Sequence, residues 1–192
     1  MGAAPLDLDG SQKKVFVEIV LDPQSWIARG EDLLEAAAFL ENAVRGQLQE
    51  IFNNSKFFWR GVHSRGPHAT YCMLMAFALE NFLKAALVRR DADILRPIIL
   101  QKGILPKQLK THELFDLMEY LDISVGPLNE VFIRKLAADA TWVGRYPVPL
   151  RCRELIVRHF SNGWEYSVPS AAEKEVEALR DIVQEVRKIL NV

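Results

Sequence analysis

The residue types best suited to catalysis lie in the C-terminal part of the chain, where Arg153 is followed by His159. An arginine can bind a phosphate and a histidine can transfer a proton, and metal-independent cleavage of RNA at a ribose hydroxyl needs both. Spacing alone is a weak signal, because arginine and histidine neighbours are common by chance. The pair supports a metal-independent endoribonuclease as one hypothesis and leaves a structural role open.

A polar stripe interrupts the most apolar segment of the chain, Tyr71 to Arg90. Glu80 and Lys84 stand in the favourable i,i+4 order for a helical ion pair, and Asn81 lies beside them. One interpretation is a solvated strip or a structural buried pair. The other is a strip that faces an interhelical cleft, where a buried carboxylate needs a cation such as Arg145.

Two further segments place polar side chains at predicted helix ends. His112 follows Thr111 at a helix start, where the helix dipole favours a neutral ring, and either a packing role or a ligand contact fits it. Arg145 follows Trp142 near a helix end, where it can bind the last carbonyls. If these segments and the stripe share one ligand site, its residues are Glu80, Asn81, Lys84, His112, Trp142, Arg145 and Tyr146.

No pattern in the sequence indicates a metal or a cofactor. The four histidines and two cysteines show no metal-ligand spacing. There is neither a glycine-rich phosphate loop nor a Gly-x-Ser-x-Gly elbow. The net charge of -1 gives no general attraction to nucleic acid or to anionic membranes. We therefore expect no metal site, no cofactor and no membrane association.

Composition predicts one intracellular domain. A chain of 192 residues is long enough for one core and short for two. Hydrophobic residues make up 49% and charged residues 26%, which is usual for globular proteins. The amino terminus lacks the charged start and apolar core of a signal peptide, and Cys72 in the apolar segment is typical of a buried thiol. These features predict a cytoplasmic protein.

Apolar residues at spacings of three and four predict the helices. Asp22 and Pro23 suit a helix start, and prolines and glycines separate the later segments. Residues 148–169 are expected to form an ordered loop. The expected main helices run from Gln24 to about Phe52, from about His68 to Arg90, from Thr111 to about Leu121, from Leu128 to about Gly144, and from the Ser170 cap to Leu190. A short helix is expected near Ala92 to Leu100, within a segment broken by prolines and a glycine.

Val15 to Leu21 is rich in β-branched residues, so a strand or an extended arm is expected there. A lone strand needs a partner, either the same segment of a second subunit or the bundle itself. The sequence as a whole predicts an all-α, up-and-down helical bundle of four to five main helices. Residues 1–22 are expected to form an N-terminal arm, and residues 23–192 a single helical-bundle domain.

Three short segments together resemble a known family. The order ALENFLKAALVRR, KTHELFDLMEYL and WVGRYP, within Trp26 to Pro147, is similar to the HEPN family of small helical-bundle proteins. This resemblance implies a HEPN-like bundle, often a homodimer, in prokaryotic stress response, defence or toxin-antitoxin systems. Many such proteins are ribonucleases whose arginine and histidine are separated by four to six residues. Arg153 and His159 have five between them, but they follow Pro149 instead of starting a helix.

Members that carry a segment like Arg145-Tyr146-Pro147 resemble a group that accompanies nucleotidyltransferases or serves for binding and dimerisation. The resemblance therefore implies a noncatalytic binding and dimerisation module, with nucleotide, RNA, a partner nucleotidyltransferase or an antitoxin protein as partners. Two alternatives stay open, the endoribonuclease and a bundle that binds a small ligand. A binding module is expected to expose an apolar face on its first or last helix.

The charge pattern favours a polyanion as partner. The segment from Lys84 to Lys110 holds seven basic residues against two acidic ones, and the next predicted helix is acidic. This polarity indicates an RNA or nucleotide surface. It also fits the orientation of two subunits or a solvated surface.

Overall fold

The computed structural model describes residues 10–53, 66–124, 127–138, 156–160, 163–167 and 175–190. Helices dominate these residues, so the predicted all-α class is confirmed. In chain order the elements are α1 (Gly10–Val20), α2 (Pro23–Asn53), α3 (Pro67–Lys102), α4 (Lys107–Lys110), α5 (Leu114–Tyr120), α6 (Pro127–Ala138), β1 (Ile156–Phe160), β2 (Gly163–Ser167) and α7 (Glu175–Leu190).

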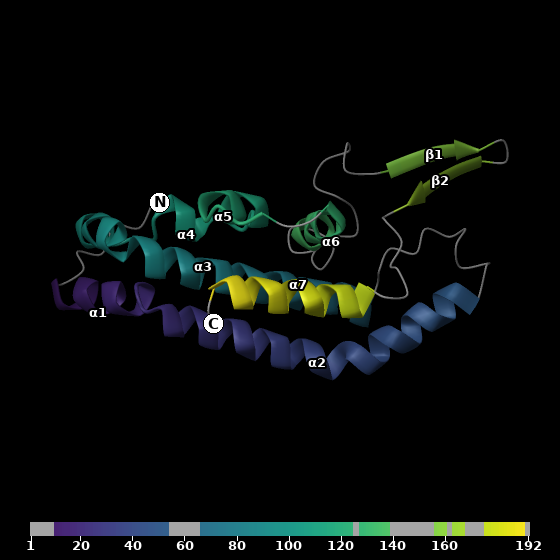
Figure 1. Cartoon of the computed structure of the whole chain (residues 1–192), viewed down its shortest axis with the longest axis horizontal. Helices are drawn as coiled ribbons and strands as arrows, with labels where there is room; N and C mark the ends of the chain where they lie inside the picture. The colour runs from purple at the N-terminus through teal and green to yellow at the C-terminus, as the bar shows by residue number, and fades with distance from the viewer. Residues whose placement is uncertain are drawn as a thin grey trace, which may run out of the picture.

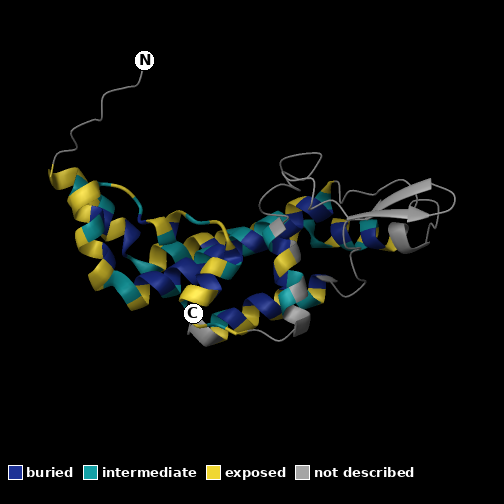
Figure 2. Cartoon of the chain, turned by 90° about the horizontal axis from the view of Figure 1, so that it is seen from above, coloured by how far each residue is buried: buried dark blue, intermediate teal, exposed yellow. Residues whose placement is uncertain are grey.

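α3 is the central helix of the bundle, as its apolar sequence predicts. It contacts α1, α2, α5, α6 and α7, and it runs antiparallel to α2 along most of its length (Figure 1). Figure 2 shows the buried residues gathered on the inner faces of the long helices. Cys72 is a buried cysteine within this core, as predicted.

α3 is also the one helix among the described residues that is long and apolar enough to cross a membrane. Of its most apolar window, 72% is buried inside the protein, and the core helix of a soluble protein has the same length and composition. The length of α3 is therefore weak evidence for a membrane span.

A kink divides α3 close to the predicted boundary between two helices. Asp91 has non-helical backbone angles, with φ of -114° and ψ of 15°, and the chain becomes helical again after it. Pro97 lies inside the second half without ending it. The helix ends at Gly103, whose left-handed backbone (φ 64°) lets its N–H donate to the Ile99 carbonyl at 2.7 Å.

α2 begins where the sequence predicts. The Asp22 carboxylate accepts hydrogen bonds from the backbone N–H groups of Gln24 and Ser25, each at 3.0 Å, and from the Ser25 hydroxyl at 2.7 Å. The bond from the Ser25 hydroxyl, followed by the backbone bonds, lowers the pKa of Asp22. Such a cap satisfies N–H groups that have no partner inside the helix.

The prediction of a strand or extended arm at Val15 to Leu21 is wrong, because this segment lies in helix α1 and the turn after it. Val17, Val20 and Leu21 are buried and come three or four residues apart, so the helix places them on one face against the core. β-propensity is a weak preference that burial of such a face outweighs. Of the predicted arm, residues 1–9 lie outside the described residues.

The predicted loop at residues 148–169 is also corrected, because β1 and β2 pair there as an antiparallel hairpin. His159 lies opposite Trp164, and Val157 opposite Tyr166. Ile156 to Phe160 is rich in β-branched and aromatic residues. The Asn162-Gly163 dipeptide that follows is a strong hairpin signal in a sequence. The prediction of a loop rested on the aromatic and arginine residues of this segment and did not use that dipeptide.

Gly30 on α2 packs directly against the Phe82 side chain of α3. A Cβ atom at Gly30 would lie 2.7 Å from Cε1 and 2.8 Å from Cζ of Phe82, whose side chain is fully buried. Gly46 lies on the same helix, and a Cβ atom there would meet nothing within 4 Å. The two glycines therefore form a matched pair for testing how tightly α2 and α3 pack.

We expect Gly30→Ala to lower the free energy of unfolding by about 1–3 kcal/mol, because the buried ring must shift. Gly46→Ala should raise it by up to about 1 kcal/mol, because alanine favours an exposed helix over glycine. Urea denaturation followed by circular dichroism measures both values. Equal effects of the two substitutions would contradict this close packing.

Candidate functional site

The polar stripe of α3 forms a buried ion pair. Lys84 Nζ lies 2.6 Å from Glu80 Oε1, and only 5% of Glu80 and 3% of Lys84 are exposed. One helical turn separates the two residues, so their side chains meet on one face. The predicted ion pair is confirmed, and both of its side chains are buried instead of lying on a solvated strip. Two charges removed from water need further hydrogen bonds to be stable.

His112 supplies such a bond from a distant part of the chain. Its Nδ1 atom lies 3.1 Å from each carboxylate oxygen of Glu80. A carboxylate only accepts hydrogen bonds, so Nδ1 must carry the proton in this contact. The opposite ring nitrogen, Nε2, then points away from Glu80 on a side chain that is 68% exposed.

The connection between α4 and α5 holds His112 in place. Leu109 on α4 and Leu114 on α5 are both buried, which anchors the backbone on either side of the histidine. The Thr111 hydroxyl accepts a hydrogen bond from the Glu113 N–H at 3.1 Å. α5 starts at Leu114, three residues later than the predicted start at Thr111. His112 therefore lies in the turn before the helix.

Trp26 completes the surroundings of the pair. Lys84 Nζ lies 5.6 Å from the centre of the indole ring, within the range of a cation–π interaction. The indole Nε1 donates to the Val20 carbonyl at 2.8 Å, which fixes the ring at the junction of α1 and α2. A single tryptophan in a helical segment gives no signal of a nearby cation, so the sequence does not identify Trp26 as part of the site.

The cluster of Glu80, Lys84, His112 and Trp26, called here the buried polar cluster, joins three parts of the fold: α2, α3 and the turn between α4 and α5. The Glu80 carboxylate contacts both Lys84 and His112, and the indole Nε1 of Trp26 is taken up by the Val20 carbonyl. No hydrogen bond of the described residues engages His112 Nε2. The arrangement can therefore position one exposed imidazole nitrogen. It fixes the connection between α4 and α5 on the central helix.

The other predicted site residues do not join this cluster in the described structure. Asn81 donates from Nδ2 to the Phe77 carbonyl at 2.7 Å, one turn back along α3. His159 lies on strand β1, not in a loop and not at a helix start. Arg145, expected as a partner of Glu80, lies outside the described residues, as do Trp142, Tyr146 and Arg153.

A second feature of the site region is a surface groove of about 480 Å³ at the end of α3. Lys102, Lys107 and Lys110 line it, together with apolar residues such as Ile104, and none of the described residues that line it is acidic. Within the part of the chain that the structure describes, these three lysines make no ion pair. This surface is called the lysine groove.

Other basic residues of the same segment have acidic partners. Arg90 Nε lies 2.8 Å from Asp91, and Arg96 Nη1 lies 2.7 Å from Glu18 on α1. Lys84 is buried with Glu80. The basic segment predicted from the sequence is therefore divided by the fold, and the three lysines that make no ion pair within the described residues gather at the lysine groove.

No protein-family model, no curated protein and no solved structure matches this chain. The HEPN resemblance therefore stays a prediction that rests on its three sequence segments. Among the described residues, no group of three or more histidine, cysteine, aspartate or glutamate side chains gathers closely enough to hold a metal ion.

The buried pair can be tested with Glu80→Leu, Lys84→Leu and the double variant. Each single variant should lose about 3–5 kcal/mol of unfolding free energy, because it leaves one buried charge without its partner. The double variant should recover most of that loss, since a leucine pair of similar size removes both charges. Urea denaturation of the four proteins gives the coupling energy. Simple addition of the two single effects would show that the pair is not coupled.

Proposed function

We propose that this chain is a noncatalytic binding and dimerisation module that binds the phosphate groups of a nucleotide or RNA at the lysine groove. The observation that carries the proposal is the grouping of Lys102, Lys107 and Lys110 around one groove without an acidic neighbour in its lining. The HEPN resemblance favours a role in a prokaryotic stress or defence system, with a nucleotidyltransferase or an antitoxin protein as further partner.

The chemistry of the groove fits a phosphate-bearing ligand. Three ammonium groups around one surface attract a polyanion and release its counterions on binding. Ile104 is exposed beside them, and such an apolar contact suits a base or a sugar better than bare phosphate. His112, two residues after Lys110, adds an exposed ring nitrogen at the end of the same connection. Charge and apolar surface together support a nucleotide or RNA.

Binding of a fluorescently labelled mixed-sequence RNA, followed by anisotropy, tests this proposal. We expect the triple variant Lys102→Gln, Lys107→Gln, Lys110→Gln to bind much more weakly. Its plot of log affinity against log salt should also be shallower by about 2, because each lost phosphate contact removes about 0.7 from the slope on a single strand.

The matched control is Lys13→Gln, Lys14→Gln, Lys188→Gln, which removes the same charge from α1 and α7. It should leave both affinity and salt slope close to those of the wild type. An equal loss in both triple variants would indicate general charge attraction and contradict a site at the lysine groove. The RNA should also stay intact during the measurement with a chelator present, because cleavage would favour the endoribonuclease alternative.

The dimerisation half of the proposal rests on α2. Phe39 is 80% exposed, and Ala36 and Ala43, three residues before it and four after it, are exposed on the same face. A large ring flanked by two small residues is self-complementary when two copies meet across a two-fold axis. A second copy of this chain is therefore the occupant we propose for this face. α1 also exposes two apolar residues one helical turn apart, Val15 and Ile19.

Sedimentation velocity over a range of protein concentrations tests the dimer. The wild type should sediment as a dimer at high concentration, and Phe39→Glu should stay a monomer, because a carboxylate would be buried without a partner. Ile94→Glu is the control, since Ile94 is an exposed apolar residue on α3. A monomeric wild type at every concentration would overturn this half of the proposal, as would equal dimerisation of Phe39→Glu.

A further inference from the structure

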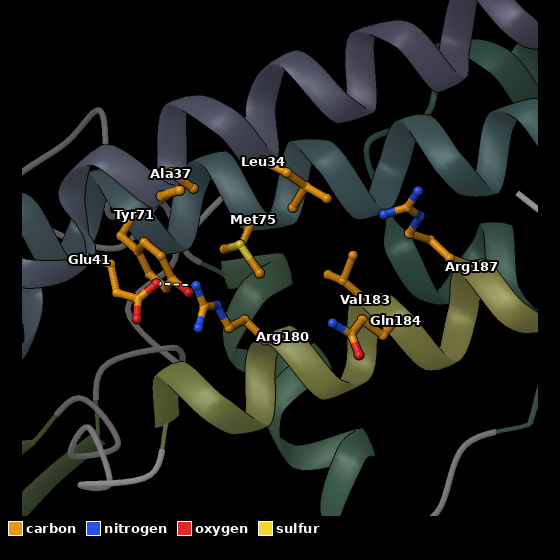
Figure 3. Close-up of a pocket in the computed structure, with 10 residues that line it drawn as sticks. Leu34, Ala37, Glu41, Tyr71, Met75, Arg180, Val183, Gln184 and Arg187 are labelled. Atoms are coloured by element: carbon orange, nitrogen blue, oxygen red, sulfur yellow. Dashed lines mark ion pairs between the residues drawn. The ribbon is translucent and has the colours of Figure 1, made fainter.

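A pocket of about 180 Å³ opens between α2, α3 and α7, lined by residues other than those of the lysine groove (Figure 3). Leu34 and Ala37 from α2, Met75 from α3 and Val183 from α7 give it apolar walls. Tyr71 and Arg187 stand at its opposite ends, as Figure 3 shows. The pocket therefore combines an apolar middle with a polar group at each end.

The Tyr71 hydroxyl is an unsatisfied polar group in this pocket. Only 2% of Tyr71 is exposed, and its hydroxyl has no hydrogen-bond partner among the described residues. A buried hydroxyl without a partner is costly and rare in folded proteins. Burial, and then the charge of Glu41, raises the pKa of Tyr71 to about 12, so the phenol keeps its proton and can donate. An acceptor atom in the pocket would satisfy it.

Arg187 carries a second unsatisfied donor. Its Nε atom is buried and has no hydrogen-bond partner among the described residues. The rest of the guanidinium group is held in place, since it pairs with Glu31 and lies 5.3 Å from the centre of the Phe82 ring. Both unmatched groups are therefore N–H or O–H donors, and a ligand that suits them must bring acceptors.

The charges around the pocket are already matched. The Glu41 carboxylate accepts hydrogen bonds from Arg45 at 2.8 Å, and its other oxygen lies 2.5 Å from Arg180. Arg45 also lies 2.6 Å from Glu177, and Arg187 pairs with Glu31. An ionic ligand would find no uncompensated charge there and would still lose its hydration. The charge balance favours an uncharged ligand.

From these observations we propose that the pocket binds a small uncharged molecule, with an apolar body and a carbonyl oxygen that accepts the Tyr71 hydroxyl hydrogen bond. Its size sets an upper limit on the ligand, because a cavity of about 150 Å³ in another protein holds a benzene molecule. A single ring or a short chain with one or two polar atoms therefore fits. The apolar body lies against Met75 and Val183.

Titration calorimetry with acetophenone and ethylbenzene tests the proposal, because the two probes have similar size and differ in the carbonyl oxygen. The wild type should bind acetophenone roughly 3- to 10-fold more tightly than ethylbenzene, the effect of one neutral hydrogen bond. Tyr71→Phe should remove this preference while leaving ethylbenzene binding unchanged. Benzoate, the charged probe, should bind more weakly than acetophenone.

Ala38→Phe gives a second variant that does not depend on Tyr71. Ala38 lines the pocket from an exposed position, so a larger side chain can fill the opening without overpacking the core. Binding of both probes should then be lost, while urea denaturation shows the variant to be folded. Equal binding of acetophenone and ethylbenzene to the wild type would overturn the proposal. So would binding of neither probe, or tighter binding of benzoate.

Discussion

The fold depends on how one buried ion pair is accommodated in its central helix. Glu80 and Lys84 lie in a helix that is covered on nearly every side, where their charges lose hydration. Two contacts from other regions of the chain offset part of this lost hydration: His112 hydrogen-bonds Glu80, and the Trp26 ring faces Lys84. Buried Leu109 and Leu114 hold the connection after α3 against the helix, where His112 reaches Glu80. Lys107 and the other lysines of the groove lie at the surface of this connection.

The sequence predicts the long helices well, because the local helix signals and the burial of each helix in the bundle favour the same structure there. The Asp22 cap marks the start of α2, and the apolar circumference of α3 required neighbours on every side. The prediction failed where the two preferences conflict. In α1, burial of Val17 and Val20 on one helix face outweighs the β-propensity of the segment. At β1 and β2, the hairpin was missed because the aromatic and arginine residues of the segment were interpreted as an ordered loop.

The candidate site was predictable only where its residues are close in sequence. The spacing of Glu80 and Lys84 predicts their contact, since a helix turn brings such residues together. The contact with His112 joins residues 32 positions apart, and no local pattern encodes it. Tyr71 lies in an apolar segment, so its sequence context predicts an ordinary core residue. Only the packed structure shows that Tyr71 lines a pocket and that its hydroxyl has no hydrogen-bond partner among the described residues.

Mapping RNA binding on the amide spectrum of the isotope-labelled protein tests the central claim most directly. If the lysine groove binds phosphate, a short RNA should shift the amide signals of residues 102–112 first, and inorganic phosphate should shift a subset of them. Shifts gathered on strand β1 around His159 would contradict this account and point to the hairpin as the RNA site. An unchanged spectrum at saturating RNA would equally contradict it.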